Sequence, residues 1–162
     1  MAICDYSDHD YEQEFWKDTG REYEDAADKM AVLKLLPWRG EIMLELGAGF
    51  GRLAEVYKHR LGKIILFDYA QNLLDKAKWH FGEDAKFTFQ QGSVYELPYD
   101  ALYVDTALMV RVSHHLEHIE KVLKEVARVI KPKGIFVMEY ANKRNFKEIV
   151  RWIAGKSQMS PF

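Results

Sequence analysis

The sequence predicts an α/β fold, a doubly wound parallel sheet of about five strands with helices on both faces. Two observations predict it. After Gly40, short apolar runs alternate with segments of helical periodicity, and the first run leads into a turn with three glycines in five residues. Since parallel strands are joined by right-handed crossovers, this alternation places helices on both faces of one sheet.

Five apolar runs are expected to form the strands. In chain order they are residues 41–46, 63–68, 86–92, 101–110 and 135–140. The intervening segments 52–62, 70–82 and 116–134 are expected to form helices. Gly62 and Gly82 would close the first two, and Pro132 with Gly134 would stop the third.

The chain divides into a central domain, residues 40–141, and two terminal segments. Residues 1–39 are acidic and aromatic, and their second half has the apolar spacing of a helix that ends before Pro37. Their aromatic side chains either pack against the central domain or form a lid over a ligand. Residues 142–162 are expected to form a C-terminal helix and a truncated end.

Composition narrows the classes of partner. The formal charge of -2 gives no overall positive field for a nucleic acid, and no apolar run approaches the roughly 20 residues that span a bilayer. Cys4 is the only cysteine, so no intrachain disulfide can form, and the sequence opens with no apolar leader. We therefore expect a cytoplasmic protein that binds neither nucleic acid nor membrane.

The stretch "LELGAGFGR", residues 44–52, joins the first strand to a helix, where backbone N–H groups can receive a polar ligand. A dinucleotide fingerprint needs glycine at its first, third and sixth positions. Gly47 and Gly49 fit, but Arg52 holds the sixth position and the third glycine comes early, at Gly51. Glu45 before the loop would repel a pyrophosphate and suits a cationic amino acid group.

Asp68 ends the second strand about 20 residues beyond the loop, where a carboxylate can accept hydrogen bonds from both ribose hydroxyls. Capping of the following helix is the alternative role of Asp68. A ribose with no pyrophosphate but with a positive amino group is what S-adenosylmethionine offers.

At this point "ELGAGFGR" resembles the glycine motif of class I S-adenosylmethionine-dependent methyltransferases. The similarity runs from about Gly40 to Tyr140 through "IILFDYA", "QGSVYELPY", "DTALMVRVSHHL" and "EVARVIKPKGIFVMEY", in the order of the small-molecule branch of that family. The resemblance implies a Rossmann-like α/β/α fold, S-adenosyl-L-methionine as cofactor, and methyl transfer to an unidentified small-molecule acceptor.

The resemblance also implies a set of cofactor-binding residues. Glu45 would organise the loop or face the ammonium, the loop glycines would pass the methionine part, and Asp68 would hold the ribose. The full set is Glu45, Gly47, Gly49, Gly51, Asp68, Tyr69, Ser93, Val94, Val110 and Arg111. Within it, Tyr69 would pack near the adenine, Ser93 and Val94 would contact the adenine edge, and Val110 with Arg111 would lie beside the methionine end.

The histidines of "SHHLEHIE" raise a catalytic question. His115 stands where a zinc protease helix needs glutamate, so no metal site is expected. His114 is the candidate general base at the mouth of the pocket, and a place in the pocket wall is its alternative. Arg52 either neutralises the ligand carboxylate or lies solvated on its helix.

The family sheet usually carries two strands after the fifth, and this chain ends before either, so it looks C-terminally truncated. An exposed edge of the fifth strand would favour self-association. Two alternatives stay open: a nicotinamide-dependent oxidoreductase, which the missing sixth-position glycine disfavours, and a cofactor-binding fragment without turnover.

Overall fold

The computed structural model describes Trp16, residues 20–140 and residues 153–155 of the chain, so the expected C-terminal helix lies almost wholly outside the described residues. One five-stranded parallel sheet has the order β3-β2-β1-β4-β5. Its strands are β1 (Gly40–Leu46), β2 (Leu61–Asp68), β3 (Phe87–Gln91), β4 (Val104–Met109) and β5 (Ile130–Met138). The predicted fold class is confirmed.

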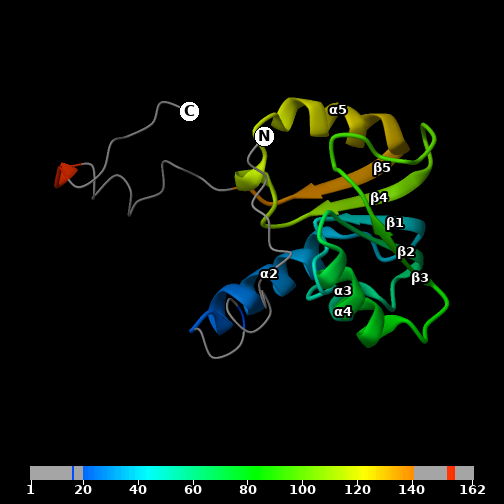
Figure 1. Cartoon of the computed structure of the whole chain (residues 1–162), viewed down its shortest axis with the longest axis horizontal. Helices are drawn as coiled ribbons and strands as arrows, with labels where there is room; N and C mark the ends of the chain where they lie inside the picture. The colour runs from blue at the N-terminus through cyan, green and yellow to red at the C-terminus, as the bar shows by residue number, and fades with distance from the viewer. Residues whose placement is uncertain (1–15, 17–19, 141–152, 156–162) are drawn as a thin grey trace.

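Helices cover both faces of this sheet, as Figure 1 shows. On one face lie α2, α3 and α4, and on the other lies α5. Their bounds are α2 (Glu22–Leu35), α3 (Ala54–Tyr57), α4 (Gln71–Phe81) and α5 (Ile119–Val129). The helix expected before Pro37 is α2.

The core follows from the alternation of side chains along each strand. In β1, Met43 belongs to the cluster under α2, α3 and α4, and its neighbour Leu44 belongs to the cluster under α5. Both are fully buried, as are Ile64 and Ile65 of β2. Because both faces are covered, the strands read as continuous apolar runs.

Two predicted helices have different bounds. The helix expected over 52–62 is only the single turn α3, because Leu61 already pairs with Gly40 as the first residue of β2. The helix expected to reach Gly134 ends at Val129, and β5 begins at once. Pro132 and Gly134 therefore do not stop a helix.

Those two residues lie instead in an irregularity of β5. Val104 pairs with Ile130, but Thr106 pairs with Ile135, so the register between β4 and β5 shifts there and the stretch with Pro132 and Gly134 is irregular. Within the described part of the chain, β5 has a strand neighbour on one side only. Self-association through its other edge stays a prediction.

At two positions in the loop after β1, the backbone passes so close to a neighbouring side chain that only glycine fits. Gly47 has a φ of 67°, and a Cβ there would clash with Cγ2 of Val112. Gly51 has a φ of 79°, and its Cβ would lie 2.8 Å from Cε2 of Phe81 on α4. The first glycine lets the loop pass the end of β4, and the last lets it pack against α4.

Replacing Gly47 with alanine tests this steric account. Gly20, with a φ of 72° and no atom within 4 Å of the position that a Cβ would take, is the matched control. We expect Gly20→Ala to lower the free energy of unfolding by about 1 kcal/mol, from backbone conformation alone. Gly47→Ala should lower it by about 3 kcal/mol, because overpacking adds to that cost. Equal losses in urea denaturation would contradict a steric role for Gly47.

Candidate functional site

A cavity opens at the carboxyl ends of β1, β2 and β4, beside the point where the strand order reverses. Open α/β sheets bind ligands in this crevice. Its wall combines the glycine loop, the ends of the strands and the turn after β4. The lining residues are Trp16, Glu45, Gly47, Ala48, Gly49, Phe50, Arg52, Leu53, Asp68, Tyr69, Leu73, Ser93, Val94, Tyr95, Val110, Arg111, Val112, His115 and Leu116.

The structure brings nine of the ten predicted cofactor-binding residues to this wall. They are Glu45, Gly47, Gly49, Asp68, Tyr69, Ser93, Val94, Val110 and Arg111. Gly51 is the exception, because it is buried against Phe81 and Leu66 on the side of the loop that faces α4. Its contribution is to the packing of the loop.

The histidine that lines the cavity is His115, and His114 is exposed outside it. Both belong to the short 3-10 turn η1 (Ser113–His115), with ring centroids 3.9 Å apart. Burial, followed by the nearby His114, lowers the pKa of His115. This shift favours the neutral form of His115, and the general-base role of His114 stays a prediction, since His114 is not part of the cavity wall.

Asp68 joins two backbone segments at the end of β2. Its Oδ2 accepts a hydrogen bond from the N–H of Gly49 at 2.7 Å, and its Oδ1 accepts one from the N–H of Ala70 at 2.9 Å. Burial raises the pKa of Asp68, and these backbone hydrogen bonds oppose the rise. Each carboxylate oxygen keeps a further lone pair for a ligand hydroxyl.

Glu45 is a buried carboxyl, 3% exposed, at the end of β1. The hydroxyl of Tyr57 on α3 donates a hydrogen bond to its Oε2. Burial raises the pKa of Glu45 to about 7, against the hydrogen bond from Tyr57 and the charge of Arg52, and the charge of Asp68 adds to the rise. Near neutral pH the group is balanced between its two forms, and a cation in the cavity would favour the ionised one.

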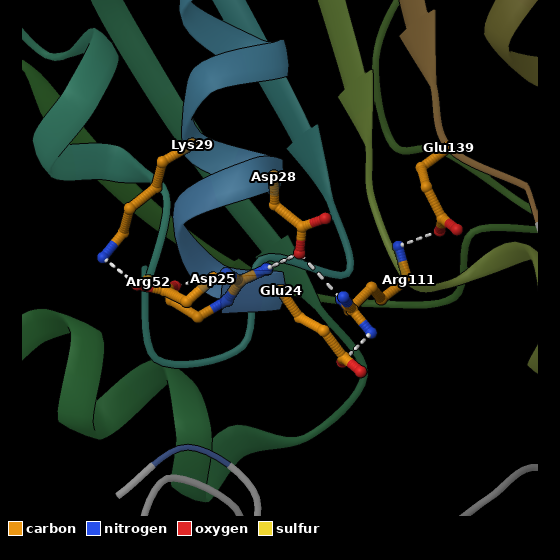
Figure 2. Close-up of polar contacts among 7 residues, drawn as sticks. All are labelled: Glu24, Asp25, Asp28, Lys29, Arg52, Arg111 and Glu139. Carbon is orange, nitrogen blue, oxygen red and sulfur yellow. Dashed lines mark hydrogen bonds and ion pairs between the residues drawn. The ribbon is translucent and has the colours of Figure 1, made fainter. Parts of the chain in front are cut away.

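Arg52 is not solvated on its helix, and its binding of a ligand carboxylate stays a prediction. Its guanidinium binds the carboxylates of Asp25 and Asp28 on α2, and the ring of Trp16 lies 3.8 Å from it. Arg111, at the end of β4, also binds Asp28 (Figure 2). The helical spacing of the acidic residues in α2 indicates that they share one face, but it does not predict that Arg52 and Arg111 are their partners.

Among the described residues, no group of three His, Cys, Asp or Glu side chains is placed to hold a metal ion. Within the same part of the chain, no helix is long and apolar enough to cross a membrane.

A family profile described as "Methyltransferase domain" matches residues 44–138, more than half of the chain. Demethylmenaquinone methyltransferase of Chlamydia caviae is 32% identical over 101 residues, which are 59% of this chain and 42% of that protein. The corresponding enzyme of Chlamydia pneumoniae is 29% identical over 132 residues, 73% of this chain and 56% of that protein. The chain thus spans about half the length of these curated relatives.

Solved structures share the fold. The crystal structure of YcgJ from Bacillus subtilis superposes with a TM-score of 0.65 and 27% identity, covering 70% of this chain and 50% of that one. Phosphoethanolamine N-methyltransferase 1 of Haemonchus contortus, solved with phosphoethanolamine and S-adenosylhomocysteine, has a TM-score of 0.71. At 20% identity over 82% of this chain and 29% of that one, it shows a likeness of fold.

The buried carboxyl of Glu45 predicts a pH-dependent stability difference. Its pKa rises from 4.5 to about 7 on folding, so the native chain holds the proton more tightly. The stability this gives is complete below pH 4.5 and is lost as pH rises through 7. Glu45→Gln keeps an acceptor for Tyr57 without the charge. The variant should match the wild type near pH 4 and exceed it by about 3 kcal/mol at pH 8.

Urea denaturation at pH 4 and pH 8 measures this difference. Glu55→Gln, at a largely exposed glutamate on α3, is the control and should show a much smaller change with pH. A Glu45→Gln gain that is the same at both pH values would contradict the proposed protonation of Glu45.

Proposed function

The chain belongs to the class I S-adenosylmethionine-dependent methyltransferase family, and we propose that it transfers a methyl group from S-adenosylmethionine to a small-molecule acceptor. The observation that carries this proposal is the cavity at the strand-order reversal. Residues from separate segments of the sequence, including Glu45, Asp68, Ser93 and Arg111, meet there on one wall.

The chemistry of these residues fits the methyl donor. Asp68 offers two carboxylate oxygens to vicinal hydroxyls, and Tyr69, half exposed beside it, offers an aromatic face to a purine. Glu45 offers a buried carboxyl, and an ammonium group beside it would favour the ionised form. The donor supplies an already reactive methyl group, so these residues have only to bind it, orient it and exclude water.

A small-molecule acceptor is supported by the named activity of the Chlamydia relatives, which act on demethylmenaquinone. The same proposal includes a cytoplasmic location and self-association through β5. It includes no nucleic acid partner and no membrane partner. The single cysteine, the net charge of -2 and the edge position of β5 support them.

Replacing Asp68 tests the proposed ribose contact. Asp68→Asn keeps the shape but loses the charge and one acceptor, so we expect the Kd for S-adenosylhomocysteine to rise about tenfold or more. Isothermal titration calorimetry measures it. Asp75→Asn, on α4 and hydrogen-bonded only to its helix neighbour Gln71 among the contacts described, is the matched control and should leave the Kd unchanged.

The same titrations separate the competing functions. NAD bound in preference to S-adenosylhomocysteine would overturn the methyltransferase proposal in favour of an oxidoreductase. An unchanged Kd in Asp68→Asn would place the ribose elsewhere in the cavity.

A further inference from the structure

Two arginines at the cavity share one carboxylate. Oδ2 of Asp28 accepts a hydrogen bond from Nη2 of Arg52 at 2.8 Å and another from Nε of Arg111 at 2.7 Å. Asp25 also binds Arg52, and Glu24 lies 3.2 Å from Nη1 of Arg111. Figure 2 shows α2 presenting these acidic side chains to both guanidinium groups.

The arginines are held at the cavity by elements other than α2. Arg52 follows the glycine loop, and Arg111, two residues beyond β4, has a φ of 60°, a left-handed conformation that is uncommon outside glycine. The N–H of Arg111 donates to Oε2 of Glu139 at 2.9 Å, which fixes the backbone there. Trp16 lies against both guanidinium groups. The pair is thus a preformed, partly buried positive site.

Both arginines line the cavity, and their side chains are 12% and 27% exposed. Guanidinium groups bind carboxylates with strong directional hydrogen bonds. The seated carboxylate of Asp28, 14% exposed, shows that one such group fits between them. It belongs to α2, none of whose residues lines the cavity, and reaches the site through its ion pairs with the two arginines.

We propose that Arg52 and Arg111 form a binding site for a ligand carboxylate, and that Asp28 occupies this site until the ligand displaces it. The inference rests on the proposed function, since the methionine part of S-adenosylmethionine carries one carboxylate. An acceptor molecule is the second possible source of that group. In either case Asp28 is an internal competitor that lowers the apparent affinity for the ligand.

Decarboxylated S-adenosylmethionine is the probe that isolates the carboxylate, because it keeps the adenosine, the sulfonium and the ammonium group. Asp28→Asn removes the competing charge. We expect the variant to bind S-adenosylmethionine at least about threefold more tightly than the wild type and to bind the decarboxylated compound unchanged. Calorimetry at low ionic strength measures both. Glu22→Gln, in the first turn of α2 and outside the arginine contacts, is the matched control.

A separate titration tests whether the carboxylate comes from the acceptor. In it, benzoate is added to protein saturated with S-adenosylhomocysteine. Tighter benzoate binding in Asp28→Asn, with both adenosine compounds unchanged, would assign the site to the acceptor. No change with any of the three probes, or equal weakening of both adenosine compounds, would overturn the proposal and leave Asp28 a structural contact of α2.

A folding defect in Asp28→Asn is recognised by circular dichroism. Glu24→Gln then serves as the second variant, because Glu24 is half exposed and contacts Arg111 alone of the two arginines. It should give a smaller gain in the same direction. A wild-type chain that binds neither adenosine compound would count against the proposed function itself. The outcomes above concern only the arginine site.

Discussion

The site depends on how the loop after β1 is bound to the end of β2. The N–H groups of Gly47 and Ala48 both donate to the carbonyl oxygen of Phe67, at 2.8 and 3.1 Å. The next hydrogen bond runs from the N–H of Gly49 to the Asp68 carboxylate. The loop is therefore folded back over the strand next to its own, and the carboxylate that faces the cavity also fixes the loop. The side chain of Asp68 therefore both holds the loop in place and presents its carboxylate to a ligand.

This arrangement places two carboxyl groups close together in a buried part of the molecule, where ionisation is costly. Burial raises the pKa of both Glu45 and Asp68, the charge of Asp68 adds to the rise at Glu45, and the hydrogen bond from Tyr57 offsets only part of it. The nearby arginines do not neutralise these carboxyls fully, because α2 supplies its own carboxylates to both. A cationic ligand group relieves this imbalance, and a pyrophosphate would add to it. Charge therefore favours a sulfonium nucleoside over a dinucleotide.

The strands and the cavity could be predicted because they depend on local periodicity and on the rule that parallel strands end at one edge. These two signals do not determine which of two adjacent residues faces the cavity. Whether His114 or His115 faces the cavity depends on the rotation of one 3-10 turn, and whether Gly51 meets ligand or Phe81 depends on the packing of α4. The partners of Arg52 could not be predicted, because they depend on where α2 docks, which no sequence spacing fixes.

The two ends of α2 are held by different interactions. Val32 and the following Leu36 are buried in the core, where each side chain contributes about 2 kcal/mol that salt does not screen. Asp25 and Asp28 at the other end hold the helix by ion pairs, and such pairs are weaker and fall off with ionic strength. The contacts of α2 therefore combine an apolar part that ionic strength does not weaken with an ion-paired part that it does weaken.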